Sequence, residues 1–369
     1  MADADQHDTG LEGVVVADTR LSDVDGQRGK LVIADQDVEV LAGARPFEEV
    51  CALLWGATRD EVAGRIGQAR AEAFNRLPCL GDALDRGSGM DALRAGLAHA
   101  NTSGDALTDA TSVVGAAAVI VSAWLRTRAR AAPISPDSTR GHSEDFLRMA
   151  LGAQPAPQRS RALDTYLVTV CDHGMNASTF TARVVASTGS DMISAVVAAV
   201  GALKGPLHGG APGPVLDMLD AIGTPEKARA WLEGELHAGR RIMGMGHRIY
   251  RVRDPRAAVF ERQIERLAES AVDASADEVK RMRARLALAR AVEHEAESLL
   301  SARHPDRPLR ANVEFFTAVL LEAIGLPRES FAPTFALGRA AGWCAHVMEQ
   351  RARGRLIRPA SRYIGATPA

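Results

Sequence analysis

Lysine is scarce in this chain of 369 residues, because only four of its 44 lysines and arginines are lysines and 40 are arginines. A single arginine is therefore weak support for an anion-binding site, and only arginines gathered in a defined cluster indicate one. Neither sign of charge predominates, since the net charge at pH 7 is −2. The chain thus lacks the overall positive field that would attract nucleic acid or anionic lipid.

Cysteine is also sparse, and its four positions lie far apart with no CxxC pair among them. This spacing argues against a zinc ribbon and against a disulfide framework, and it fits a protein of the reducing cytosol. We expect all four thiols to be buried as small apolar side chains. They are Cys51, Cys79, Cys171 and Cys344.

Targeting signals are missing from the sequence as well. The first ten residues, "MADADQHDTG", have neither the basic and apolar segments of a secretory signal nor the arginines of a mitochondrial presequence. The longest apolar run, residues 113–125, is too short to span a bilayer and is expected to form a buried helix. These features predict a cytoplasmic protein without a membrane or nucleic-acid partner.

Strand signals are confined to the N-terminal region. Two apolar segments, "GVVVADT" and "GKLVI", flank the turn-forming "SDVDGQRG", so a small hairpin is predicted over residues 13–33. The rest of the chain has helical periodicity, and residues 275–303 open with a capping box from Ser275 to Glu278. The predicted fold class is mostly α, with a small N-terminal β-hairpin.

Two glycine-rich stretches each contain a histidine. In "LKGPLHGGAPGP", His208 precedes two glycines, which allow the backbone to approach a ligand closely. A helix-breaking loop with an incidental histidine is the alternative. In "RRIMGMGHRIYRVRDPR", His247 follows a glycine turn and precedes clustered arginines, which suits a ligand with several carboxylates or phosphates. A solvated basic helix start is the alternative there, and the pattern lacks the third glycine of a dinucleotide fingerprint.

A third stretch, "RANVEFFTAV", places one acid, Glu314, on a helix expected over residues 312–324. Periodicity alone leaves open whether this carboxylate is solvated or buried. In "CDHGMNASTFTARV", His173 precedes a polar cluster, which suits either a helix cap or the wall of a site. Arg339 lies among small and apolar residues in "FALGRAAGWCAHVMEQ", so its charge is expected to need an anionic partner.

Taken together, these stretches resemble the citrate synthase family. The quoted motifs occur in the family's order over residues 11–365, joined by "GLEGVVVADTRLSDVDG" and "GMDALR" near the N-terminus. The resemblance implies a mostly α, multi-helical homodimer with a large domain (1–212 and 320–369) and a small domain (213–319). It implies condensation of acetyl-CoA with oxaloacetate to give citrate and CoA, with acyl-CoA as co-substrate and with no metal or tightly bound cofactor.

The resemblance also assigns roles, residue by residue. Two histidines and an acid are expected to be catalytic: His208, His247 and Glu314. Four residues are expected to bind oxaloacetate, the last of them reaching into the neighbouring subunit's site: His173, Arg256, Arg339 and Arg358. Five residues are expected to face CoA: Met243, Gly244, Met245, Gly246 and Arg251.

These roles agree with the chemistry that the reaction needs. The methyl group of a thioester is a very weak acid, and a carboxylate with an ordinary pKa near 4.3 is a poor base for it. Burial raises the proton affinity of such a carboxylate, here Glu314. A neutral histidine, His208, donates a hydrogen bond to the thioester oxygen where negative charge develops. His247 polarises the keto oxygen of oxaloacetate and protonates it as the new bond forms.

Glu314 is itself the main departure from the family, which usually has aspartate after "NV". The extra methylene moves the carboxylate by roughly 1.5 Å if the backbone stays in place. A shift of about 1 Å can change a rate by on the order of 10²-fold. Two alternatives therefore stand beside citrate synthase: a 2-methylcitrate synthase that uses propionyl-CoA, and a weakly active or inactive paralogue that binds acyl-CoA.

Overall fold

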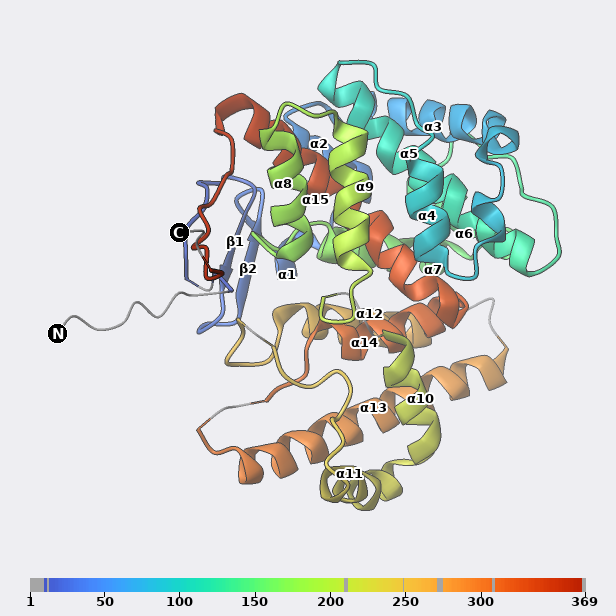
Figure 1. Cartoon of the computed structure of the whole chain (residues 1–369). Helices are drawn as coiled ribbons and strands as arrows, with labels where there is room; N and C mark the ends of the chain where they lie inside the picture. The colour runs from blue at the N-terminus through green and yellow to red at the C-terminus, as the bar shows by residue number, and fades with distance from the viewer. Residues whose placement is uncertain are drawn as a thin grey trace.

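The computed structural model describes residues 10–11, 13–208, 212–247, 249–270, 275–306 and 309–366. The described chain is mostly helical with one small N-terminal sheet, which confirms the predicted fold class. Figure 1 shows two tiers, with α10 to α14 below the other helices. The α-helices are α1 (Val38–Leu41), α2 (Phe47–Trp55), α3 (Arg59–Asn75), α4 (Gly89–Leu97), α5 (Ala106–Arg128), α6 (His142–Leu151), α7 (Pro157–Val170), α8 (Ala177–Ser187), α9 (Met192–Leu203), α10 (Pro212–Ile222), α11 (Ala228–His237), α12 (Pro255–Glu269), α13 (Ala276–Arg303), α14 (Val313–Ile324) and α15 (Phe331–Arg353). Short 3-10 helices are η1 (Leu77–Leu80), η2 (Ala83–Asp85), η3 (Pro225–Lys227) and η4 (Arg328–Ser330).

The N-terminal hairpin forms, but its first strand is not where the sequence placed it. Strand β1 (Ser22–Asp25) pairs antiparallel with β2 (Lys30–Ile33), and β3 (Gln36–Asp37) adds a third, unpredicted strand. The predicted strand over 13–19 is wrong, since this segment has no strand structure. The reason is that the turn takes up only residues 26–29. The Asp25 carboxylate accepts hydrogen bonds from the amides of Gln27 and Arg28, which confines the turn to the residues after Asp25. Residues 22–25, although rich in turn-forming types, can therefore pair as strand β1.

Helix α5 runs through the centre of the upper tier, and the apolar run over 113–125 is buried within it as predicted. Gly115 lets α3 approach closely, because a Cβ there would press on Ala69 and on the backbone of Arg70. By length and composition α5 is also apolar enough to cross a membrane. Its burial under α3, α4, α6 and α15 instead identifies it as a core helix.

Helix α13 begins where the capping signal predicted. The Ser275 hydroxyl accepts a hydrogen bond from the Glu278 amide at 3.2 Å. The Glu278 carboxylate forms an ion pair with Arg159 of α7. This pair ties the start of the long lower helix to the upper tier.

Three of the four cysteines are buried as predicted, namely Cys51, Cys171 and Cys344. The prediction is wrong for Cys79, which is exposed. Cys79 lies in the short 3-10 helix η1 at the surface, where the chain leaves α3.

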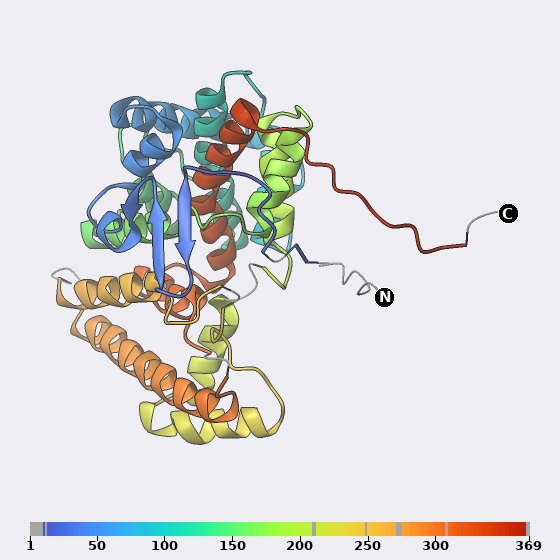
Figure 2. The same ribbon diagram turned by 90° about the vertical axis from the view of Figure 1, so that its left-hand side faces the viewer.

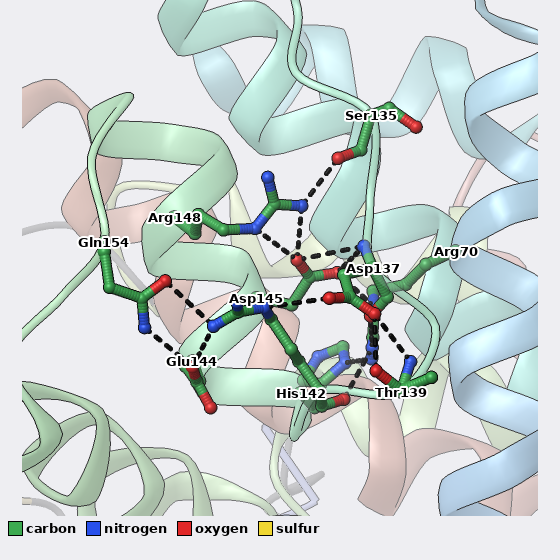
Figure 3. A network of polar contacts seen from close by, with 10 residues as sticks. Arg70, Ser135, Asp137, Thr139, His142, Glu144, Asp145, Arg148 and Gln154 are labelled. Carbon is green, nitrogen blue, oxygen red and sulfur yellow. Dashed lines mark hydrogen bonds and ion pairs between the residues drawn. The ribbon is translucent and has the colours of Figure 1, made fainter.

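A buried polar cluster joins α3, α6 and the loop between α5 and α6 (Figure 3). It consists of Arg70, Asp137, Arg140, His142 and Asp145, and we call it the Arg70 cluster. The Arg70 guanidinium donates to Asp145 at 2.9 Å, to Nδ1 of His142 at 3.4 Å, and to the carbonyl oxygens of Asp137 and Arg140 at 3.2 and 2.8 Å. Each nitrogen of the guanidinium therefore has at least one partner.

The C-terminal arm, residues 354–366, leaves α15 and runs in an extended form away from the helices (Figure 2). The predicted division into two domains stays a prediction. Its first boundary, after residue 212, falls at the start of α10, and the second, after residue 319, falls inside α14.

Candidate active site

The loop before His247 holds the N-terminus of α14. Asn312 caps the helix by accepting from the amide of Glu314 at 2.9 Å, and its side-chain amide donates to the carbonyl of Gly246 at 2.9 Å. Gly244 accepts from the amide of Asn312, also at 2.9 Å. Glycine is required at position 244 because φ is +74° and a Cβ would press on Phe315. Two motifs far apart in the sequence thus pack as one unit.

Asp254 joins α12 to α14 and orients an arginine. Its Oδ1 accepts from the amide and Nε of Arg256, both at 3.0 Å, and its Oδ2 accepts from Nη2 at 2.7 Å. The same Oδ2 accepts from the amide of Val313, the first residue of α14, at 3.1 Å. Arg256 is 2% exposed, so its guanidinium is held in one orientation inside the protein.

His247 presents a defined ring nitrogen. Its Nδ1 accepts from the amides of Ile249 and Tyr250 at 3.1 and 3.2 Å. In the neutral ring the proton therefore lies on Nε2, which is left as a donor. Burial, together with the positive charge of Arg256, lowers the pKa of His247 to about 4. The ring is neutral at pH 7 and can donate a hydrogen bond.

His173 lies against His247 and the same tyrosine. The two imidazole rings meet edge to face with centroids 5.6 Å apart, and Nε2 of His173 is 3.1 Å from the hydroxyl of Tyr250. Burial holds the pKa of His173 well below its usual range, and the positive charges of Arg256 and Arg339 act in the same direction. The structure thus brings together His173 and His247, which the sequence placed on separate motifs.

Arg339 is a buried cation without an ion-pair partner in the described part of the chain. The other three buried arginines there, Arg70, Arg183 and Arg256, each form an ion pair. Arg339 is 2% exposed and donates from Nε to the carbonyl of Val170 at 2.6 Å, but within the described ranges no carboxylate lies within ion-pair distance of it. Burial lowers its pKa to about 10; the more distant charge of Asp172 opposes this shift, and the charge of Arg256 adds to it. An anion bound between the two guanidiniums would stabilise both.

Glu314, on the first turn of α14, is half-buried. Burial raises its pKa above the ordinary glutamate value, while the positive charge of Arg256 acts against this rise. The open question from the sequence is thereby answered: the carboxylate is partly removed from water and is a stronger base than a solvated one.

His208 is brought to the start of α8. Its Nε2 accepts from the amide of Ser178 at 3.2 Å and lies 2.9 Å from the Ser178 hydroxyl. Asn176 and the indole of Trp343 bond the same hydroxyl at 2.8 and 3.1 Å. Because Nε2 accepts from an amide, the proton of the neutral ring lies on Nδ1.

The turn of the N-terminal hairpin packs on the segment after His247. The amide of Arg251 donates to the carbonyl of Gly26 at 2.9 Å. A Cβ at Gly26 would collide with the carbonyl oxygen of Ile249, and one at Gly29 would press on Val252. The sequence predicts the turn of the hairpin, but no pattern in it indicates that this turn touches the site.

A cavity of about 520 Å³ opens beside His247. Of the residues predicted to face CoA, Met245 and Gly246 line this cavity, whereas Met243 and Gly244 do not, and Arg251 is exposed outside it. Their role in binding CoA stays a prediction. The cavity wall also contains basic residues that the sequence analysis missed: Arg240, Arg241, Arg303 and His304. These basic residues do not stand out in the sequence, because arginine is abundant throughout the chain.

Other supporting residues were also missed, although some had a signal. Asp254 precedes a proline and begins a helix, which is a recognisable cap pattern. Asn176 is a helix cap of the same kind for α8. No sequence pattern marks the roles of Tyr250 and Trp343, because their hydrogen-bond partners come from distant parts of the chain.

Arg358 is not brought to the other site residues of its own chain. It lies on the exposed C-terminal arm, one residue after Ile357, whose amide donates to the Ser187 hydroxyl of α8 at 3.0 Å. The remaining predicted residues lie around the ends of α8, α12 and α14, on the loops that precede these helices, and in α15.

Known proteins resemble this chain over nearly its whole length. The family model "Citrate synthase, C-terminal domain" matches residues 10–360. A protein named putative citrate synthase 2 from Mycobacterium tuberculosis is 37% identical, over 97% of this chain and 93% of that protein. The 2-methylcitrate synthase of the same organism is 33% identical, over 96% of this chain and 90% of its own.

A solved structure supports the same relation. Citrate synthase from Thermoplasma acidophilum, described as a ternary complex with carboxymethyl coenzyme A and oxaloacetate, superposes with a TM-score of 0.82 at 28% identity, covering 98% of this chain and 96% of that one. The helical fold, the matched length and the shared motifs agree. The chain belongs to the citrate synthase family and is an acyltransferase of the citrate synthase type.

Proposed function

We propose that this enzyme condenses acetyl-CoA with oxaloacetate and hydrolyses the resulting citryl-CoA to citrate and CoA. One observation carries the proposal. A carboxylate with raised proton affinity, Glu314, lies near the buried guanidinium of Arg256, which in turn lies near that of Arg339, and Arg339 has no carboxylate within ion-pair distance among the described residues. A base beside a preformed dianion site is what the condensation needs.

In this proposal oxaloacetate binds through His173, Arg256 and Arg339, with Arg358 supplied by the partner subunit. Bidentate guanidiniums suit the two carboxylates of the substrate. The bound dianion would take the place that a protein carboxylate occupies in the other buried arginine sites. It would also remove the repulsion between the two cations.

The acyl group would then be activated by two side chains. Glu314 removes a proton from the methyl carbon, and the electron pair moves onto the thioester oxygen, which accepts a hydrogen bond from the Nδ1 proton of His208. The new carbon–carbon bond forms at the keto carbon of oxaloacetate, whose oxygen accepts from the Nε2 proton of His247. Water then cleaves the thioester bond of citryl-CoA, and the thiol of CoA leaves with a proton.

The cavity beside His247 is the proposed place for CoA. Arg240 already bonds Glu235 there, at 2.6 to 2.7 Å, so Arg241 and Arg303 are the arginines best placed to meet phosphate groups. Met245 and Gly246 would contact the thioester end of the molecule. The predicted absence of a metal or tightly bound cofactor stays a prediction.

We further propose that the enzyme is a homodimer in which the C-terminal arms are exchanged. The arm exposes three large apolar residues in the single chain: Leu356 at 58%, Tyr363 at 73% and Ile364 at 88%. Such side chains are expected to bury against a second copy. Sedimentation tests this, since a fully active monomer would contradict the exchange.

A 2-methylcitrate synthase is the second candidate, because relatives of both names match at similar identity. Propionyl-CoA differs from acetyl-CoA by one methylene, which a pocket discriminates by only about 10- to 200-fold. Steady-state kinetics with both thioesters, followed through release of the CoA thiol, separates the two. A tenfold or greater preference for propionyl-CoA in kcat/KM, on the order of 1.4 kcal/mol, would replace acetyl-CoA in the proposal.

Glu314→Asp belongs in the same assay, because the family usually has the shorter acid. Turnover by the wild type excludes an inactive paralogue. If only Glu314→Asp turns over, the longer side chain has displaced the base, and the wild-type protein binds acyl-CoA without condensing it.

A further inference from the structure

A buried chain of hydrogen bonds passes through α15 from the loop that carries His173. His346 is fully buried, and its Nε2 lies 3.1 and 3.2 Å from the two carboxylate oxygens of Asp172. On the other side, Nε of Arg183 donates to Nδ1 of His346 at 3.0 Å. Because arginine only donates, Nδ1 is the acceptor and the proton lies on Nε2, which donates to Asp172. The imidazole therefore connects an anion to a cation.

The first end of this chain fixes the active-site loop. Asp172 directly precedes His173, and it accepts from the hydroxyl of Ser22 at 2.5 Å. The same hydroxyl accepts from the amide of Gly174 at 2.9 Å. At Gly342 of α15 a Cβ would collide with the carbonyl oxygen of Cys171, so the helix touches the loop directly.

The second end fixes the start of the C-terminal arm. Nη1 of Arg183 donates to the side-chain oxygen of Gln350 at 3.0 Å, and Nη2 forms an ion pair with Glu349. The amide group of Gln350 in turn donates to the carbonyl of Arg355 in the arm at 3.0 Å. Arg358 follows three residues later. One continuous set of bonds therefore joins the residue before His173 to the base of the arm that presents Arg358.

We propose that His346 is a positioning residue that aligns the arm, so that a change at His346 in one subunit weakens oxaloacetate binding in the partner's site. The inference rests on the proposed function, in which Arg358 crosses the dimer. Its physical basis is that both charged neighbours of His346 are buried. If the imidazole were lost, Asp172 would keep only its bond from Ser22 and Arg183 only its bonds at the base of the arm, and each could replace the lost hydrogen bond only by moving the loop or the base of the arm.

A mixed dimer separates this action from a local one. Two differently tagged subunits are co-expressed, one wild type and one carrying Glu314→Gln together with His346→Leu, and the heterodimer is isolated through both tags. Only the wild-type subunit has its catalytic base, and its site receives the arm of the altered subunit. We expect the KM for oxaloacetate of this dimer to rise on the order of tenfold over the dimer with Glu314→Gln alone, with kcat and the KM for acetyl-CoA little changed.

Two matched variants make the readout specific. His346→Gln replaces the ring by an amide that accepts from Arg183 and donates to Asp172, and it should restore the KM for oxaloacetate. His142→Leu in the altered subunit removes another fully buried histidine, that of the Arg70 cluster, and should lower the unfolding temperature without changing this KM.

An unchanged KM for oxaloacetate in the mixed dimer with His346→Leu would overturn the proposal. If that subunit fails to fold, Gln350→Leu breaks the same chain at the arm and must give the same rise in KM, or the proposal is wrong. Failure of the proposed function has a different signature: a Glu314→Gln homodimer with wild-type turnover, or a fully active monomer, would remove the basis on which the inference rests.

Discussion

The Arg70 cluster and the candidate active site both bury guanidiniums, but they satisfy them differently. Arg70 has a carboxylate, an imidazole nitrogen and two carbonyl oxygens around it, all from its own chain. Arg339, equally buried, has one carbonyl and no carboxylate among the described residues. Breaking the ion pair of a buried cation destabilises the fold, whereas a buried cation with no anion at ion-pair distance is ready to bind one. Pairing therefore distinguishes the two regions, and burial alone does not.

Removing the acid of the active site tests this difference most severely. Glu314→Gln should lower kcat by on the order of 10³-fold, because the amide cannot accept the methyl proton. Oxaloacetate binding, followed by calorimetry, should stay nearly intact. The matched control, Asp145→Asn in the Arg70 cluster, should instead lower stability and leave kcat unchanged. If Glu314→Gln loses oxaloacetate binding, the carboxylate has a structural role.

The two arginines themselves should respond in opposite ways to the same substitution. Arg70→Met leaves the carboxylate of Asp145 short of a partner in the interior, and should lower the free energy of unfolding by about 3–5 kcal/mol without changing the kinetics of the folded enzyme. Arg339→Met removes a cation that has no ion pair, so urea unfolding of the free protein should be unchanged or shifted to higher concentration. Its affinity for oxaloacetate should fall by on the order of 10²-fold. Equal losses of stability in both variants would contradict the distinction.

The pH dependence of the rate should report the active site alone. Glu314 must be ionised to act as a base, and its pKa is raised by burial, so kcat should fall with falling pH at values above those of an ordinary glutamate. The pKa of His247 is about 4, so this imidazole stays neutral across that limb. A kcat profile for wild type and His142→Leu checks the assignment, since the Arg70 cluster should not contribute. If the acidic limb of the kcat profile shifts in His142→Leu, the limb does not report Glu314 alone, and the assignment is wrong.

The smallest expected effect is that of a substitution at Asp164 of α7, which lies beside the Arg70 cluster. Burial raises its pKa to about 7, with the charge of Glu48 adding to the rise, so the folded state favours the protonated form. This contribution to stability is fully present below the unfolded pKa and is lost as the pH rises through about 7. Asp164→Asn should therefore raise the unfolding temperature at pH 8 more than at pH 5, with no change in kcat. An equal shift at both pH values would show that Asp164 is ionised in the folded state.

The sequence predicted the features that local patterns determine. The mostly α class, the buried helix over 113–125, the cap at Ser275 and the helix of Glu314 all follow from periodicity and capping. The first strand was misplaced because the turn is shorter than its composition suggests. Cys79 was misjudged because burial depends on what packs over a turn, which composition does not reveal.

The site was predictable only in part, for a related reason. Motifs supplied the histidines and Arg256, but not the partners that orient them. Ser178 fixes the tautomer of His208, and Asp254 fixes the guanidinium of Arg256. These partners become visible only when the distant segments are assembled.

The contact between Gly26 and Arg251 has a consequence for the order in which the site is assembled. The hairpin is synthesised long before the loop on which its turn packs, because most of the helices lie between them in the sequence. Contacts of such large sequence separation are slow to form, because a long loop must be closed before they are made. The position of the His247 loop is therefore expected to be fixed after the intervening helices have packed.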